Sequence, residues 1–401
     1  MSILTHRWCV GALVVLLGVP GARAQWTHLG AVTSCERGEA VLTLQCGTAA
    51  VRIEAVNEYV VRVRLASEGR FGRDYSWAVT DLTPKGRFVT FEDGPDQLRA
   101  TTGALAVVVH RNPCRLEVLD AEGHLLTADE QARGMAWCVG EKGQDPLLAK
   151  SSPGGSPSQL PSSSAVRVWQ HLPGEVAIYG LGEKTGPLNK NGRAWTMWNT
   201  DTPAYGPSTD PLYKSVPFFI VAREGRYHGV FFDNPWRTSF DFGQLDRDVL
   251  SFGAEGGELN YYVIAGPGPK DVVQRYTDLT GRIELPPKWA IGYHQCRHSY
   301  FPEARVREIA ATFREKKIPC DVLYFDIEYM NGHRCFTWNP EWFPDPAGLM
   351  ADLHRMGFHT VAIIDPGIGR EPGYFVYDEG TKIGAWLTKP DGEAYVGKVW
   401  P

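Results

Sequence analysis

Hydrophobic and polar positions follow one pattern up to about residue 270 and a different one after it. Residues 59–65 alternate with a period of two, and residues 105–110 and 216–221 are short β-branched or aromatic runs. Gly, Pro and Asp separate these segments, which is typical of the antiparallel strands of a β-sandwich. We therefore expect residues 25–270 to form an antiparallel β-sandwich, and we expect the Ser/Pro/Gly-rich segment 151–164 to be a loop inserted in it.

Beyond Pro286 and Pro287 the pattern becomes strand, helix, strand, helix. Apolar segments at 289–296, 321–328 and 360–364 predict three strands, and the near-continuous apolarity of the second is typical of a buried parallel strand. Pro302 and Pro346 are placed to begin two amphipathic helices between these strands. Repeated βα units indicate an α/β barrel or a doubly wound sheet. A closed eightfold barrel needs about 250 residues, so residues 271–401 are expected to hold only its first part.

A barrel with few strands has consequences for the isolated chain. An open sheet edge leaves backbone hydrogen-bonding groups unpaired and apolar faces uncovered. We therefore expect the 401-residue polypeptide, expressed alone, to be inactive and prone to aggregate.

The first 24 residues read as a signal peptide. A charged start precedes an apolar run at residues 8–20, and Ala22-Arg23-Ala24 is a small-x-small cleavage site before Gln25. A transmembrane anchor is disfavoured because the run is shorter than the roughly 20 residues that a spanning helix needs. We expect a secreted or periplasmic protein, free of the membrane after cleavage.

Composition excludes two classes of protein. With 43% hydrophobic and 11% aromatic residues the chain can build a large core, so it is not a disordered protein. A net charge of −5 without basic runs makes nucleic acid a poor partner. Nothing in the sequence calls for a cofactor, and the oligomeric state is not indicated. After signal cleavage seven cysteines remain, an odd number that fits at most an isolated bridge, such as Cys35–Cys46 or Cys114–Cys138.

Candidate chemistry stands at the predicted strand ends, where barrel enzymes place their active sites. Along one strand His294, Cys296 and His298 would share a face, but this spacing is unlike most structural zinc sites, so no metal is expected. Asp326 and Glu328 would also share a face. Because two glycosidase carboxylates must flank the scissile bond from opposite sides, we do not expect these two to be the catalytic pair. Asp326 is suited to accept hydrogen bonds from sugar hydroxyls, or simply to cap a loop.

Several ordered sequence blocks surround these residues. In the expected barrel they are residues 292–297 (Gly-Tyr-His-Gln-Cys-Arg), 321–330, 363–366, 377–380 and 397–401; in the β domain they are 179–183 (Tyr-Gly-Leu-Gly-Glu) and 198–201 (Trp-Asn-Thr-Asp). Together these blocks resemble glycoside hydrolase family 31, the α-glucosidase and α-xylosidase family. The resemblance implies a galactose mutarotase-like β-sandwich followed by the first part of a TIM (β/α)8 barrel.

The resemblance also implies roles for individual residues. Asp326 matches the aspartate that binds hydroxyls of the sugar in the cleaved subsite, and Trp400 matches the aromatic wall of that subsite. Ile363 matches an apolar contact, and Asp201 matches a carboxylate that the sandwich domain projects to the sugar. These residues would then converge on one sugar-sized hollow.

Two positions depart from the family pattern. His298 stands where many members have an aromatic residue, usually Trp, and Glu328 replaces the usual second Asp of its block. Both changes bear on which sugar fits the pocket.

No catalytic residue is assigned within the chain. The family's nucleophile and its acid/base, both aspartates, belong to later blocks, so we expect them beyond Pro401. The resemblance implies a retaining hydrolase that acts on an oligosaccharide or α-glycoside. A non-catalytic carbohydrate-binding relative and an unrelated metal-dependent barrel hydrolase remain as alternatives.

Overall fold

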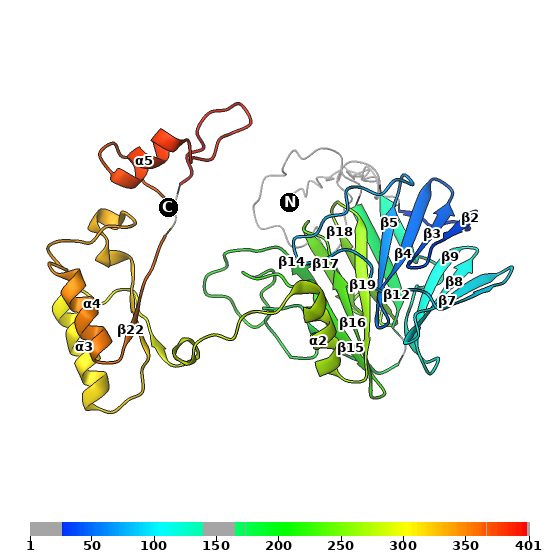
Figure 1. Cartoon of the computed structure of the whole chain (residues 1–401), viewed down its shortest axis with the longest axis horizontal. Helices are drawn as coiled ribbons and strands as arrows, with labels where there is room; N and C mark the ends of the chain where they lie inside the picture. The colour runs from blue at the N-terminus through cyan, green and yellow to red at the C-terminus, as the bar shows by residue number, and fades with distance from the viewer. Residues whose placement is uncertain (1–25, 139–164, 173, 366, 399–401) are drawn as a thin grey trace, which may run out of the picture. The chain divides into compact units, whose positions relative to one another are not determined.

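The computed structural model describes residues 26–138, 165–172, 174–365 and 367–398, which form two compact units divided after Arg282. The expected signal peptide and the segment 151–164 lie outside the described residues. Helix α2 (Pro269–Thr280) spans the expected domain boundary at residue 270 and packs on strands of the first unit (Figure 1). Its buried side chains Val272 and Leu279 share an apolar cluster with Phe218 and Tyr262, which explains why the first unit extends to Arg282.

The described part of the first unit consists of three antiparallel sheets and helix α2. The eight-stranded sheet has the order β13 (Ala177–Gly180), β15 (Phe218–Arg223), β16 (Arg226–Phe232), β19 (Leu259–Gly266), β5 (Val60–Ala66), β4 (Ala49–Asn57), β3 (Val41–Cys46) and β2 (Ser34–Arg37). The six-stranded sheet has the order β1 (Thr27–His28), β11 (Met135–Cys138), β12 (Ala165–His171), β18 (Val249–Ala254), β17 (Thr238–Phe242) and β14 (Ala194–Met197). The five-stranded sheet has the order β10 (Leu125–Ala128), β9 (Cys114–Asp120), β8 (Leu105–Arg111), β7 (Gln97–Thr101) and β6 (Thr90–Asp93).

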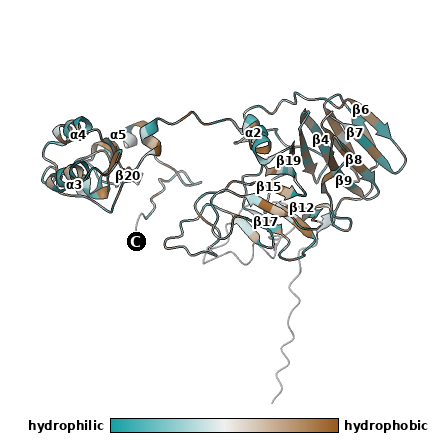
Figure 2. Ribbon diagram, turned by 90° about the horizontal axis from the view of Figure 1, so that it is seen from below, coloured by the Kyte–Doolittle hydropathy of each residue, from teal (hydrophilic) through white to brown (hydrophobic). Residues whose placement is uncertain are grey.

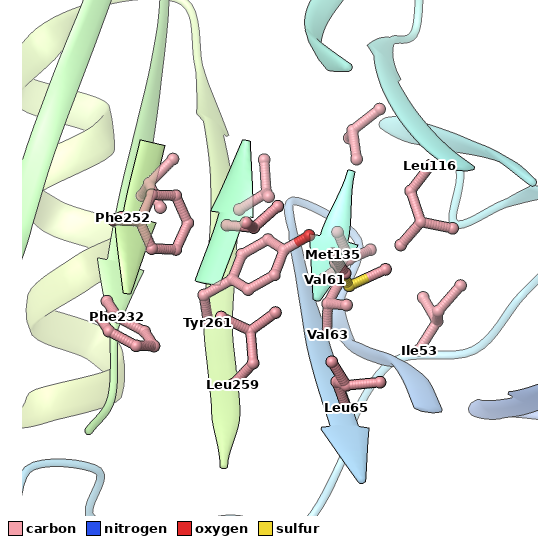
Figure 3. Packing of buried hydrophobic residues seen from close by; sticks show 14 of the residues in the cluster. Ile53, Val61, Val63, Leu65, Leu116, Met135, Phe232, Phe252, Leu259 and Tyr261 are labelled. Atoms are coloured by element: carbon pink, nitrogen blue, oxygen red, sulfur yellow. The ribbon is translucent and has the colours of Figure 1, made fainter. Parts of the chain in front are cut away.

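One apolar core joins these sheets. In β3 buried and partly exposed positions alternate strictly, as a period of two requires of a strand with one buried face. Figure 3 shows Phe252 of β18, Tyr261 of β19 and Leu116 of β9 in this core, with Tyr261 between the other two, and Figure 2 shows hydrophobic segments along the strands. The predicted antiparallel β-sandwich is confirmed.

Strand β5 differs from a simple sandwich strand because its polar positions are also buried. The Arg62 guanidinium bonds Glu54 at 3.1 Å and Asp74 at 2.8 Å, and Arg64 bonds Glu258 at 2.7 Å. Each buried cation is thus paired, as a charge removed from water requires. The alternation of residues 59–65 predicted the strand but not its pairing carboxylates, which come from the adjacent strand β4, from the segment after β5 and, for Glu258, from 194 positions along the chain.

The short-range disulfides that the sequence allowed are not formed. All seven described cysteines are free thiols, so neither the Cys35–Cys46 nor the Cys114–Cys138 bridge is present. Packing of the sheets in the common core instead brings the buried thiols of Cys46 in β3 and Cys114 in β9 together as hydrogen-bonding partners, which raises the pKa of the Cys114 thiol. Neighbours in sequence were therefore a poor guide to neighbours in the core.

The second unit contains a parallel sheet of order β20 (His294–Gln295), β21 (Val322–Phe325) and β22 (His359–Ala362). Helix α3 (Glu303–Glu315) joins the first two strands and α4 (Pro346–Arg355) the next two, and α5 (Phe375–Ile383), which was not anticipated, follows β22. Pro302 and Pro346 begin α3 and α4 as expected. This βα succession, with its covering helices, matches the predicted start of an α/β barrel.

The strands of this unit are shorter than the sequence suggested. Residues 289–291, expected in the first strand, belong instead to the 3₁₀ helix η1 (Lys288–Ile291) after Pro287, whose missing N–H suits a helix start. The second strand ends at Phe325 instead of residue 328. Asp326 accepts a hydrogen bond from the Ile327 N–H at 2.7 Å and thereby begins the 3₁₀ helix η2 (Ile327–Tyr329), which η3 (Asn331–His333) follows.

Candidate functional site

The carboxyl ends of β20 and β21 bring three polar side chains together. His298 lies beyond β20, and Asp326 and Glu328 follow β21; the nearest ligand atoms of all three lie within 4.8 Å of one another. Parallel pairing of His294 with Val322 fixes the register that places these segments side by side. Because parallel strands end at the same edge of a sheet, residues about 30 positions apart in sequence become neighbours.

Asp326 and Glu328 offer different surroundings to a ligand. Asp326 Oδ1 accepts the hydrogen bond from the Ile327 N–H, and Asp326 Oδ2 takes no part in that bond. The Glu328 side chain is only 16% exposed, and its Oε1 lies 3.4 Å from Nε2 of the 75% exposed His298. Its Oε2 is buried and has no hydrogen-bond partner among the described residues. A buried acceptor without a partner carries a free-energy cost that a hydroxyl donor from a ligand would relieve.

Ile363 lies directly beside this carboxylate cluster. It follows β22, and its N–H donates to the carbonyl of Phe325, the residue before Asp326, at 2.9 Å. The Tyr329 hydroxyl donates to the Ile363 carbonyl at 2.9 Å, and the half-buried Ile363 side chain packs against the core of the unit. Ile363 therefore stands at the same sheet edge as Asp326, with its side chain against the core of the unit.

Electrostatics and donor geometry define what this cluster can bind. Partial burial and then the Asp326 charge raise the pKa of the neighbouring Cys296 thiol, so the thiol stays protonated near Asp326. Imidazole and carboxylate groups at this spacing could hold a cation, although the His-x-Cys-x-His set weighed in the sequence is not the one assembled: His294 bonds the Tyr324 hydroxyl at 3.2 Å instead. The same acceptors equally suit the hydroxyls of a sugar.

The first unit presents its own polar and aromatic loop. Asp201 is exposed on the segment after β14, and the Tyr213 hydroxyl donates to its carboxylate. Desolvation and this bond raise the pKa of Tyr213. The rings of Tyr205 and Tyr213 meet edge to face at 6.3 Å, and Trp198 is half exposed. An aromatic face beside a carboxylate suits a sugar ring, which has both apolar faces and hydroxyl edges.

The structure thus assembles part of the expected site. His298, Asp326 and Ile363 lie together at one sheet edge, and Asp201 belongs to the loop of the first unit. Trp400 lies outside the described residues. The sequence reasoning missed Tyr213, whose only signal was its place in an aromatic segment close to Asp201.

Each of the two units matches a domain of a known protein family. The description "Glycosyl hydrolase 31 N-terminal galactose mutarotase-like domain" matches residues 50–241, and "Glycosyl hydrolases family 31 TIM-barrel domain" matches residues 283–401.

Individual relatives agree with the family matches. Alpha-glucosidase 2 of Bacillus thermoamyloliquefaciens is 40% identical over 383 residues, which are 94% of this chain and 45% of the relative. An alpha-xylosidase of Lactiplantibacillus pentosus is 36% identical over 56% of this chain and 29% of its own length. The chain thus spans less than half the length of these relatives.

Solved structures share the fold. A family 31 dextranase of Flavobacterium johnsoniae in complex with isomaltotriose matches with a TM-score of 0.80 and 32% identity, covering 94% of this chain and 43% of the dextranase. The two family descriptions, the relatives and this fold agree with the blocks recognised in the sequence. The chain belongs to glycoside hydrolase family 31.

Proposed function

We propose that this protein is an exported retaining α-glycosidase that hydrolyses terminal α-linked glucosyl or xylosyl residues. In this proposal the chain supplies substrate-binding residues, namely Asp201, Asp326, Trp400, Ile363 and His298, while the nucleophile and the acid/base lie beyond Pro401. The similarity to an alpha-glucosidase, an alpha-xylosidase and a dextranase supports α-linked sugars as the substrate class.

The carboxylate cluster at the end of β21 is the observation that carries the proposal. A sugar presents several hydroxyl donors at close spacing, and Asp326 and Glu328 offer carboxylate acceptors within 4.8 Å of one another. In addition, Glu328 Oε2 is buried and has no hydrogen-bond partner among the described residues. Hydrogen bonds to charged acceptors contribute about 1.5–3 kcal/mol each. In this proposal Ile363, which stands at the same sheet edge, supplies the apolar contact, so the site would combine the two kinds of contact that a pyranose ring needs.

The proposal predicts turnover with retention by the natural polypeptide that contains this chain. We expect it to hydrolyse p-nitrophenyl α-glucoside or p-nitrophenyl α-xyloside and to release the α-anomer first, because a covalent glycosyl intermediate inverts the anomeric carbon twice. Proton NMR of the product before mutarotation measures this. Sugar binding without turnover would favour the non-catalytic carbohydrate-binding alternative. A polypeptide that shows no binding and no turnover would contradict the proposal.

Export is the second expected property. The pattern of residues 1–24 supports a cleaved signal peptide, although these residues lie outside the described structure. Among the described residues, the helices are too short or too polar to cross a membrane. We expect the mature protein outside the cytoplasmic membrane to begin at Gln25, as N-terminal sequencing would show. A mature chain that begins at Met1 would contradict export by this route.

A further inference from the structure

A buried ion pair lies beneath the loop that carries Asp201. The Lys184 side chain is 1% exposed, and its ammonium donates to Asp210 Oδ1 at 2.6 Å and to the Thr196 carbonyl. Neither charged residue was singled out in the sequence, because they are 26 positions apart on separate loops. Their contact exists only in the folded unit.

Asp210 uses both of its oxygens. While Oδ1 accepts from Lys184, Oδ2 accepts from the Thr196 N–H at 2.6 Å. Thr196 belongs to β14, which pairs with β17 in the six-stranded sheet. The ion pair therefore connects the segment after β13, strand β14 and the loop 198–213 at one point.

Other bonds attach the same loop to the same support. The Thr185 hydroxyl donates to the Thr209 carbonyl at 3.0 Å, and the Thr200 N–H donates to the Leu212 carbonyl at 3.0 Å. The Thr200–Leu212 bond joins the two ends of the loop, so the loop starts and finishes at the same place in the fold. Directly next to this bond, the Tyr213 hydroxyl bonds the carboxylate of the exposed Asp201.

The ion pair is better suited to fix geometry than to add stability. Burial lowers the pKa of Lys184, and the Asp210 charge opposes this change without overcoming it. Removing charges from water costs about as much free energy as their mutual attraction returns, so buried ion pairs often contribute little net stability. Breaking one partner, however, leaves an unpaired buried charge that displaces its surroundings.

We propose that Lys184 and Asp210 are positioning residues that hold the loop 198–213 in the conformation in which Asp201 meets the substrate. This inference rests on the proposed function for the role of Asp201, but the ordering of the loop can be measured without substrate. Lys184 and Asp210 act through the loop and need not touch the sugar.

The test compares Lys184→Met with Lys214→Met in the natural polypeptide. Met is close to Lys in length and apolar, so Lys184→Met removes only the charge and the donors. We expect faster amide hydrogen exchange across residues 198–213 and a KM for p-nitrophenyl α-glucoside raised about tenfold, with kcat changed less than about threefold. Lys214 is an exposed lysine of the neighbouring segment, and its replacement should change neither quantity.

Two further variants separate positioning from general damage. Asp210→Asn keeps an acceptor for the Thr196 N–H but loses the charge, so it should loosen the same loop even if Lys184→Met fails to fold. The double variant Lys184→Met/Asp201→Asn should have a KM no higher than that of Asp201→Asn alone, because both substitutions act on the same contact between Asp201 and the substrate. Folded variants with unchanged exchange and unchanged KM would overturn the inference, whereas an inactive wild type with altered exchange in the variants would overturn only the proposed function.

Discussion

Replacing Asp326 by asparagine is expected to lower kcat/KM for p-nitrophenyl α-glucoside by about 100- to 1000-fold and to leave the fold intact. Asparagine is as good as aspartate at the start of a helix, so the bond from the Ile327 N–H is kept. The negative charge that strengthens hydrogen bonds from sugar hydroxyls is lost. Each tenfold change corresponds to about 1.4 kcal/mol, so the expected loss is about 3–4 kcal/mol, as for one or two charged hydrogen bonds.

Asp321→Asn is the matched control for this experiment. Asp321 precedes β21 and lies at the opposite end of the same strand, where its carboxylate accepts from the Tyr293 N–H at 3.3 Å. Although Asp321→Asn replaces the same atoms, it should change kcat/KM less than about threefold. Near wild-type activity in Asp326→Asn, or equal losses in both variants, would show that Asp326 does not bind the sugar.

Replacing Asp129 by asparagine is expected to stabilise the sandwich at pH 8 and not at pH 5. Asp129 follows β10 and is fully buried; its Oδ2 accepts from the Leu116 N–H at 3.0 Å, and its Oδ1 has no partner among the described residues. Burial raises the pKa of this carboxyl from 3.8 to about 7, although the Leu116 bond and Arg115 act in the opposite direction.

The sign of this pH dependence follows from proton binding. Between about pH 4 and 7 the folded protein holds a proton on Asp129 that the unfolded chain has released, so the free energy of unfolding falls as pH rises through this range and then levels off. A shift of about three units corresponds to about 4 kcal/mol as an upper limit. Asparagine avoids this cost but leaves an amide N–H₂ to be satisfied, so we expect a net gain of about 1–3 kcal/mol at pH 8.

Urea unfolding of the parent protein and the variant at pH 5 and pH 8 measures this difference. Asp96→Asn is the control, because Asp96 is exposed in the turn between β6 and β7. A gain for Asp129→Asn that is the same at both pH values would contradict burial of the charged carboxylate as the cause.

The fold class could be predicted because burial imposes a period on the sequence. Strand β3 alternates as one buried face requires, and the spacing of Val306, Ala310, Leu349 and Leu353 matches the buried faces of α3 and α4. Strand ends were less predictable. A local hydrogen bond, such as the one from the Ile327 N–H to Asp326, ends a strand without any change in hydrophobicity.

The candidate site was predicted only in part, for a related reason. Asp326 was found at a predicted strand end, and the family resemblance added His298 and Ile363; parallel pairing places all three at one edge of the sheet. Contacts between distant loops leave no period in the sequence. The Lys184–Asp210 pair and the Tyr213–Asp201 bond therefore became visible only in three dimensions.

By itself the sequence determined the β-sandwich, the βα units that follow it, and the family to which the chain belongs, because apolar spacing and short motifs are local properties. Only the tertiary structure decided which charges are buried, which cysteines meet and which acceptors remain unpaired. Arg64, which pairs with Glu258, and Cys46, which meets Cys114, illustrate the reason: the environment of a side chain depends on partners that the fold brings from far along the chain.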